Sequence, residues 1–339
     1  MWVIVLGINS QFKRAFHAAR ELGLHVFLIT AENNVPDDIK NLTDSMKVVK
    51  DYEFGEIVSI IKRQLPDDQI TLFWTLKDQL LPLTNKLNRY FDSPAKFYSG
   101  PLISICKNKL MLRRALEKTP YNPVFNLYVP GQKNPFSAWS GPKVIKPLLG
   151  YSSIGVEMVT SEQQVYSAIE RSLSVLEKIS HEVKSFDFSH EYDVCKTLLV
   201  EDYIDGEEYS VEIFANKDGI KCLGICEKSK MPPPYFEEIS YCMPGRLKQS
   251  LCDGLKSAAM KIAEVLDFRS GMAHLEFKCS DNKIILLDIG LRLGGGGLTH
   301  ELIHISSGID AVKAVLAELC GMESNQYLIE KRKDIALLY

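Results

Sequence analysis

Two carboxylates and an arginine stand close together in residues 271–297, GMAHLEFKCSDNKIILLDIGLRLGGGG. The alternation of apolar and polar residues predicts two strands, joined by a turn at residues 280–283. Glu276 and Asp288 lie at nearly equal offsets from this turn, so strand pairing would place their Cβ atoms roughly 5 Å apart. Carboxylates this close repel each other unless a positive charge lies between them. A hard divalent cation suits them, most often Mg²⁺ with phosphate, and Arg292 adds a fork suited to phosphate or carboxylate.

The same alternation assigns each hairpin residue to one of two faces. On the first strand we expect a buried face of Ala273, Leu275, Phe277 and Cys279 and an opposite face of His274, Glu276 and Lys278. On the second strand we expect burial of Ile285, Leu287, Ile289 and Leu291, with the other face made by Ile284, Leu286, Asp288, Gly290 and Arg292.

A lysine followed by a loop rich in glycine and serine forms a second candidate site. Lys146 ends a predicted strand, and residues 150–155, GYSSIG, follow it. Backbone N–H groups and the hydroxyls of Ser152 and Ser153 can surround phosphate oxygens. The loop is not a Walker A motif, because Gly155 is followed by valine, and an ordinary surface turn is the alternative.

An acidic segment at residues 198–212, LLVEDYIDGEEYSVE, forms a third candidate site. Glu201 ends an apolar strand, and Glu207 and Glu208 follow a turn. A carboxylate at a strand end suits the amino group of adenine, and a second carboxylate suits a ribose diol. The alternative is an ordinary hairpin with a solvated acidic turn.

The pattern HELIH at residues 300–304 matches the zinc-peptidase motif H-E-x-x-H. In that interpretation His300 and His304 bind zinc, Glu301 is the base, and Glu323 is a distant third ligand. Against this, the sequence SSG at residues 306–308 ends the helix almost at once. A catalytic zinc site needs three placed protein ligands, so we regard the zinc hydrolase as a weaker alternative.

Length and composition exclude several classes of protein. The chain has 339 residues, 46% hydrophobic and 24% charged, with a net charge of −3. We therefore expect two or three subdomains, no nucleic-acid partner and no membrane span. The start, MWVIVLG, has no signal-peptide pattern, and the eight cysteines include no C-x-x-C pair. These features predict a cytoplasmic protein with reduced cysteines.

The first 98 residues alternate strand and helix, which predicts a parallel sheet. We expect strands at residues 2–6, 25–30, 45–49 and 70–75 and helices at residues 10–22, 53–65 and 78–90. The pattern resembles a Rossmann unit, but residues 7–10, GINS, do not match G-x-G-x-x-G. An NAD-dependent oxidoreductase is therefore a weak alternative.

The rest of the chain mixes helices with antiparallel strands. We expect helices at residues 104–118, 162–180, 247–266 and 310–319, and a connection at residues 119–142. Strands are expected at residues 143–146, 156–159, 197–203, 208–216 and 220–227, the last three antiparallel, followed by a long loop at residues 229–245.

Four segments, taken in order, resemble the successive motifs of the ATP-grasp superfamily. They are NKL at 108–110, VIKPLLGYSSIG at 144–155, VEDYIDGEEYSVE at 200–212 and HLE…DIGLRLGG at 274–295. The resemblance covers nearly the whole chain and implies an α/β (α+β) ATP-grasp fold. It implies a Rossmann-like pre-ATP-grasp domain at 1–98, a linker helix and small lid subdomain at 99–205, and a C-terminal antiparallel-sheet subdomain at 206–339. Within the superfamily the chain looks most similar to the carboxylate–amine ligases that act on amino acids.

The resemblance also implies a role for each matching residue. These roles are contact with ATP phosphates for Lys109 and Lys146, closure on the phosphates for Ser152 and Ser153, adenine recognition for Glu201 and the backbone around Tyr203 and Ile204, ribose binding for Glu208, Mg²⁺ binding for Glu276 and Asp288, and, with Lys146, stabilisation of the transferring phosphoryl group for Arg292. The resemblance also places residues 229–245 and 294–297 beside the substrate. Our own candidates for the substrate pocket are Glu238, Tyr241, Arg246, Arg292, Gly295 and Gly296, and the alternative for the first three is that they are solvated loop residues. A homodimer is an ordinary expectation for such an enzyme.

The chain departs from the family pattern at two positions. Asp288 stands where the family usually has Glu, which keeps the charge with a shorter reach. Gly290 stands where the family usually has Asn, which removes one oxygen ligand. One or two Mg²⁺ ions, with Mn²⁺ as a substitute, are therefore expected, the second held more loosely.

The implied reaction uses ATP to convert a small carboxylate into an acyl phosphate, which an amine then attacks to form an amide. ADP and phosphate are released, and a closing loop excludes water. An ATP-binding regulatory module without catalysis is the main alternative.

Overall fold

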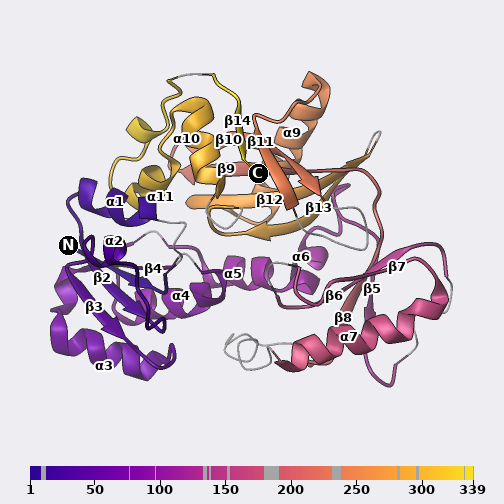
Figure 1. Cartoon of the computed structure of the whole chain (residues 1–339), viewed down its shortest axis with the longest axis horizontal. Coiled ribbons are helices and arrows are strands. Elements are labelled where there is room, and N and C mark those ends of the chain that lie inside the picture. Colours follow the sequence, from indigo (N-terminus) through magenta and orange to yellow (C-terminus); the bar gives the residue numbers. More distant parts are fainter. Residues whose placement is uncertain are drawn as a thin grey trace.

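The computed structural model describes residues 1–8, 13–75, 77–95, 97–132, 136, 139–150, 153–178, 191–230, 238–280, 283–294, 298–331 and 333–338. Within these residues the chain forms three β-sheets with helices packed against them (Figure 1). No helix in this part of the chain has the length and apolar character needed to cross a membrane.

The N-terminal sheet is parallel and has the order β3-β2-β1-β4. Its strands are β1 (Trp2–Leu6), β2 (His25–Thr30), β3 (Ser45–Val48) and β4 (Ile70–Thr75), and its helices are α1 (Lys13–Glu21), α2 (Asp37–Lys40), α3 (Phe54–Gln64) and α4 (Leu81–Tyr90). The inner strands are apolar almost throughout because helices cover both faces of the sheet. This part agrees with the predicted βαβ series. Short 3₁₀ turns precede β4 and α4, at η2 (Asp67–Gln69) and η3 (Asp78–Leu80).

A four-stranded antiparallel sheet has the order β5-β8-β6-β7. Its strands are β5 (Phe125–Tyr128), β6 (Lys143–Pro147), β7 (Glu157–Val159) and β8 (Leu198–Asp202), and it carries η4 (Glu162–Gln164) and α7 (Val165–Lys178). Buried apolar residues of α7 pack against β6 and β8, so this unit has a small core of its own. It lies at the lower right of Figure 1, apart from the N-terminal sheet.

The largest sheet has six antiparallel strands in the order β13-β12-β9-β10-β11-β14. They are β9 (Glu207–Asn216), β10 (Gly219–Lys230), β11 (Glu238–Met243), β12 (Gly271–Ser280), β13 (Lys283–Gly290) and β14 (Ala336–Leu338). The associated helices are α5 (Gly100–Lys107), α6 (Lys109–Ala115), α9 (Gln249–Val265), α10 (Leu298–Ser307) and α11 (Ala311–Leu319), with η6 (Asn325–Tyr327) after them.

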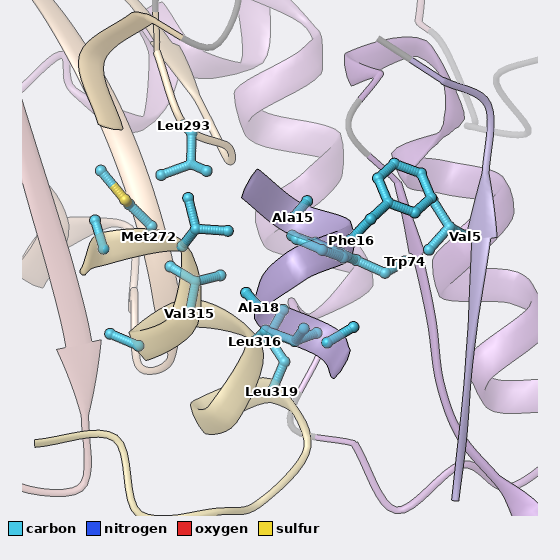
Figure 2. Packing of buried hydrophobic residues seen from close by; sticks show 14 of the residues in the cluster. Val5, Ala15, Phe16, Ala18, Trp74, Met272, Leu293, Val315, Leu316 and Leu319 are labelled. Carbon is cyan, nitrogen blue, oxygen red and sulfur yellow. The ribbon is translucent and has the colours of Figure 1, made fainter. Parts of the chain in front are cut away.

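One face of this sheet is apolar along its length, and the other face is divided. The apolar face packs against α5, α6 and α9. On the opposite face, Phe214 and Met272 pack against α11, which in turn packs against α1 of the N-terminal sheet (Figure 2). The rest of that face is polar, with Ser210, Glu212 and His274 buried along β9 and β12. Polar residues in a buried sheet face need partners, so this half-face is the natural place for a site.

Several predicted elements differ from the structure. The single helix expected at residues 104–118 is two helices, α5 and α6. Asn108 has an extended backbone between them, and its side chain accepts hydrogen bonds from the backbone N–H groups of Leu110 and Met111. An N-cap of this kind starts a new helix and ends the previous one.

Three strand predictions were also wrong. The connection expected at residues 119–142 contains β5, which pairs with β8. The strand around residues 198–202 does not pair with β9 but belongs to the four-stranded sheet. Much of the loop expected at residues 229–245 is strand, because β10 continues to Lys230 and β11 begins at Glu238. Strand β14 was not predicted.

Candidate active site

A cavity of about 760 Å³ lies where the four-stranded sheet, the six-stranded sheet and helices α5 and α6 meet. Its lining contains most of the predicted ligands: Lys109, Lys146, Ser153, Glu201, Tyr203, Ile204, Glu208, Tyr241, Glu276, Asp288 and Arg292. These residues span 184 positions of the sequence, from 109 to 292, and folding brings them to one place.

Some predicted residues are elsewhere or are not described. Arg246 is exposed and does not line the cavity, and its backbone N–H donates to Glu227 at 2.9 Å. Glu238 begins β11, but its side chain lies outside the described part of the chain, as do Ser152, Gly295 and Gly296.

The predicted carboxylate pair is at one end of the cavity. Strands β12 and β13 pair with Glu276 directly opposite Asp288, as the turn position predicted. Lys228 donates from Nζ to Glu276 Oε1 at 2.6 Å, and Lys109 Nζ lies 3.3 Å from Asp288 Oδ2. Burial alone would raise the pKa of Glu276, but Lys228 and His274 hold it well below its ordinary value. Glu276 is therefore ionised beside Lys228, and the Asp288 carboxylate lies beside Lys109.

A β-bulge corrects the predicted faces of β13. The register shifts between Glu276 and Phe277, so that Phe277 pairs with Leu286 and Leu287 is the extra residue. As a result Leu286 is fully buried in the core, with Ile284 packed against that core, while Leu287 lines the cavity. The alternation predicted the opposite, because one inserted residue reverses a period of two.

A buried histidine supports Glu276 from the inside of the sheet. His274 Nε2 lies 3.1 Å from Glu276 Oε1, and its Nδ1 lies 2.5 Å from Glu212 Oε1. Burial would lower the pKa of His274, but Glu212 and Glu276 raise it above its ordinary value. A Cβ atom at Gly294 would overlap the imidazole ring, so the first glycine of the Gly294–Gly297 run is needed for this packing.

Arg292 reaches across the cavity to the N-terminal sheet. Its Nε donates to Asp78 Oδ2 at 2.8 Å, and Lys107 Nζ lies 3.5 Å from the same oxygen. Asp78 begins η3, directly after β4, and is mostly buried. The nearby Asp78 carboxylate raises the pKa of Arg292 despite burial, so the guanidinium keeps its charge.

A second cluster of charged groups surrounds Glu201, which also lines the cavity. Glu201 Oε1 accepts from Arg113 Nε at 2.5 Å, and Oε2 accepts from Lys146 Nζ at 2.6 Å. Arg113 is fully buried and also donates from Nη2 to the Leu287 carbonyl at 2.7 Å. Burial would raise the pKa of Glu201, but Arg113 and Lys146 lower it to about 2. Burial lowers the pKa of Lys146 from its ordinary value.

The other predicted ribose and adenine residues, Glu208, Tyr203 and Ile204, also line the cavity. Glu208 is buried on β9, opposite Lys228 of β10 and Lys278 of β12 in the strand register. Lys228 Nζ lies 3.9 Å from Glu208 Oε1. The backbone N–H of Tyr203 donates to the Pro142 carbonyl at 3.0 Å, and the Lys278 ammonium lies 4.9 Å from the centre of the Tyr203 ring. A Cβ at Gly206 would overlap the Cys279 carbonyl, so the segment from β8 to β9 can pass β12 only with glycine there.

Sequence reasoning missed several charged residues in and around the site, among them Lys107 and Asp202, and four that the site's ion pairs depend on: Asp78, Arg113, Glu212 and Lys228. Lys228 carried a signal, because a lysine two residues after Cys226 continues an apolar strand and must find a partner if it is buried. The other three have partners far away in sequence, and no local pattern marks them.

The H-E-x-x-H pattern does not form a metal site within the described residues. Helix α10 carries His300 and His304 and ends at Ser307, as expected. In the part of the chain that the structure describes, no three His, Cys, Asp or Glu side chains come together as metal ligands. The zinc interpretation is therefore not supported by the geometry.

Among the residues that the structure describes, no third His, Cys, Asp or Glu joins Glu276 and Asp288 as a metal ligand. Glu276 and Asp288 are partly open to the cavity and supply hard oxygen ligands. Mg²⁺ is commonly held by one or two carboxylates, with its other ligands from phosphates and water. The donor set therefore fits a cation that arrives with a nucleotide.

Comparisons with known proteins agree with this arrangement. Residues 139–300 match the model of the ATP-grasp domain family. A D-alanine–D-alanine ligase of Oceanobacillus iheyensis is 26% identical over 156 residues. That match covers 44% of this chain but only 37% of the relative's length.

Solved structures extend the likeness to nearly the whole chain. An L-amino acid ligase from Bacillus licheniformis superposes with a TM-score of 0.78 at 21% identity, covering 99% of this chain and 78% of that one. A biotin carboxylase from Campylobacter jejuni in complex with β,γ-ATP gives 0.75 at 15% identity, covering 99% and 74%. An N5-carboxyaminoimidazole synthetase from Staphylococcus aureus complexed with ADP gives 0.69 at 12% identity, covering 99% and 80%. The arrangement of the three sheets and the domain match together lead to one conclusion: this chain has the ATP-grasp fold, and its residues 139–300 match the ATP-grasp domain.

Proposed function

We propose that the protein is an ATP-dependent ligase that activates a small carboxylate, such as an amino acid, as an acyl phosphate and joins it to an amine. The observation that carries this proposal is the charge arrangement at one end of the cavity. Glu276 and Asp288 face each other across β12 and β13, and Lys109, Lys228 and Arg292 surround them. The relatives named above as amino-acid ligases support the choice of a carboxylate substrate.

The carboxylates would hold Mg²⁺ or Mn²⁺, which when bound neutralises phosphate charge. Lys109 and Lys228 now neutralise these carboxylates. With a cation bound there, the Lys109 ammonium, which lines the cavity, would become available to the phosphate oxygens, while buried Lys228 would stay beside Glu208 and Glu276. Lys146 and Ser153 also line the cavity and would contact the triphosphate. The site would then exchange a lysine–carboxylate pair for a lysine–phosphate pair, with little loss of charge balance.

In the same cavity, the adenine would bind to Glu201, Tyr203 and Ile204, and the ribose would bind to Glu208. Arg113 donates to one oxygen of the Glu201 carboxylate and Lys146 donates to the other, which fixes its orientation. The ordered carboxylate and the backbone beside it would then accept hydrogen bonds from the base. Tyr241, on β11 of the six-stranded sheet, and Arg292 also line the cavity, and these two of our predicted substrate residues would contact the substrate.

The reaction proceeds in two steps. A carboxylate oxygen of the substrate attacks the γ-phosphorus of ATP, the bridging P–O bond breaks, and ADP leaves. The amine nitrogen then attacks the acyl carbon, the C–O bond to phosphate breaks, and the ammonium proton passes to phosphate or solvent. Arg292 would stabilise the charge that develops on the transferring group, and the cavity walls would exclude water. We divide the chain for this purpose into residues 1–98, 99–205 and 206–339.

The test is the release of ADP and phosphate across a panel of amino acids, singly and in pairs, with Mg²⁺. We expect release with particular pairs, and with single acids only when hydroxylamine is added to trap the acyl phosphate. AMP and pyrophosphate as products would exclude the acyl-phosphate route. ATP binding with no product for any carboxylate would favour a regulatory module.

A further inference from the structure

The contact between Asp78 and Arg292 joins two sheets that are distant in sequence. Asp78 follows the last strand of the N-terminal sheet, and Arg292 follows β13, 214 positions later. The Nε–Oδ2 distance is 2.8 Å, and the Asp78 side chain is only 10% exposed. A hydrogen-bonded ion pair of this burial fixes the direction of a long side chain that would otherwise have several rotamers.

The direction so fixed carries the arginine over Gly290. A Cβ atom at Gly290 would lie 3.4 Å from Cγ and 3.5 Å from Cζ and Nε of Arg292. A methyl group would therefore just fit, whereas a longer side chain at position 290 would meet the guanidinium. While Asp78 is bound to Arg292, the arginine side chain therefore occupies the space that a side chain longer than a methyl group at position 290 would need.

The two carboxylates beside this arginine supply too few oxygen ligands to bind two divalent cations. Glu276 and Asp288 are the acidic residues that face each other here, and Gly290 adds no oxygen. A second divalent cation would need further oxygens and would lie close to a fixed positive charge. A guanidinium, in contrast, needs no protein ligand set and can pair with phosphate through two hydrogen bonds.

We propose that Asp78 is a positioning residue that holds Arg292 over Gly290, and that the arginine there takes the place of a second divalent cation. The site then binds one divalent cation per nucleotide. This inference rests on the proposed ATP site and specifies how that site supplies its positive charge. The N-terminal sheet would thereby take part in phosphoryl transfer through Arg292.

The test counts Mn²⁺ ions on the full chain saturated with a non-hydrolysable ATP analogue, from the electron paramagnetic resonance signal of free Mn²⁺. We expect one Mn²⁺ per bound nucleotide. Two ions per nucleotide would overturn the inference and leave the proposed function standing. Nucleotide without any Mn²⁺, or no nucleotide at all, would contradict the proposed function itself.

Variants at positions 78 and 290 test the role of the arginine directly. The double variant Asp78→Ala with Gly290→Asn releases Arg292 and adds an oxygen ligand, so we expect a second Mn²⁺ to bind. Gly290→Ala is the matched control, because it adds a side chain without oxygen, and its count should stay at one. A count of one in the double variant, in folded protein that still binds nucleotide, would show that Arg292 does not exclude the second ion.

Steady-state kinetics separate positioning from simple stabilisation. We expect Asp78→Asn to lower kcat about 10- to 100-fold, as is typical for loss of a supporting contact, with little change in the KM for ATP. Asp78→Glu, which restores the charge, should recover part of kcat. The control is Asp310→Asn, which weakens the pair between Arg14 of α1 and Asp310, another contact that links the N-terminal and C-terminal regions. If Asp310→Asn lowers kcat as much as Asp78→Asn, the positioning role is excluded.

Discussion

Two sets of carboxylates line the cavity beside cations, Glu201 on the one hand and Glu276 with Asp288 on the other, and they differ in burial. Glu201 is 3% exposed and accepts from two cations, of which Arg113 is completely buried. Glu276 and Asp288 are 28% and 35% exposed, and Asp288 has one lysine at 3.3 Å. A pair buried on all sides is costly to break, whereas a pair that faces an open cavity can exchange its partner for a ligand. We infer that the ion pairs of Glu201 stabilise the structure of the site, whereas Glu276 and Asp288 bind its ligands.

The largest effect on turnover is expected from substitutions of the partly exposed carboxylates, Glu276 and Asp288. We expect Asp288→Asn to lower turnover about 10³-fold or more, equivalent to about 4 kcal/mol, because one of two charged metal ligands is lost. The melting temperature should change little, since the side chain is partly exposed. Glu276→Gln should also abolish turnover, although buried Lys228 then loses its nearest partner.

The matched control for this prediction is Glu207→Gln. Glu207 is an exposed acidic residue at the start of β9 that does not line the cavity. Its substitution removes a negative charge near the site and should leave turnover unchanged. Normal activity in Asp288→Asn would remove the metal assignment.

Substitution of buried Glu201 should instead lower the free energy of unfolding. We expect Glu201→Gln to lower the free energy of unfolding by about 3–5 kcal/mol, because Arg113 and Lys146 would remain buried without a counter-charge. The comparison is Glu157→Gln, which breaks an exposed pair with Arg171 and should cost no more than about 1 kcal/mol. Urea unfolding of the two variants measures both values. Equal losses would mean that the burial of Glu201 contributes nothing special.

Lowering the pH should reduce the stability that ionised Glu201 gives to the folded protein. The pKa of Glu201 is about 2 in the folded protein, below its ordinary value of 4.5. A carboxyl whose pKa is lowered by folding stabilises the protein fully above its unfolded pKa and loses that effect as the pH falls. The contribution, on the order of 3 kcal/mol, should therefore be present above about pH 4.5 and decline toward about pH 2.

This pH effect is measured as a difference between proteins. The gap in unfolding free energy between the wild type and Glu201→Gln should narrow between pH 6 and pH 3. A gap that stays constant over this range would show that the ionisation of Glu201 does not account for its stabilising effect.

Local patterns in the sequence determined much of the fold. The βαβ series of the first 98 residues follows from apolar runs and helical periods, and the hairpin of β12 and β13 follows from alternation around one turn. Hydrophobic period and turn chemistry act between near neighbours, so they can be read without the rest of the molecule. Two of the wrong predictions also have a local cause. The N-cap at Asn108 divides one predicted helix into two, and the bulge at Leu287 reverses the faces of the residues that follow it toward the turn.

The tertiary structure alone decided which charges meet. The sequence determined that Glu276 and Asp288 would face each other, because both belong to one hairpin and one turn sets their register. It could not determine that Arg292 reaches Asp78 or that Arg113 reaches Glu201, because those partners lie on separate elements 214 and 88 positions apart. Such pairs depend on how whole sheets and helices pack, which is set by the summed burial of apolar faces and not by any pattern at the charged residues themselves.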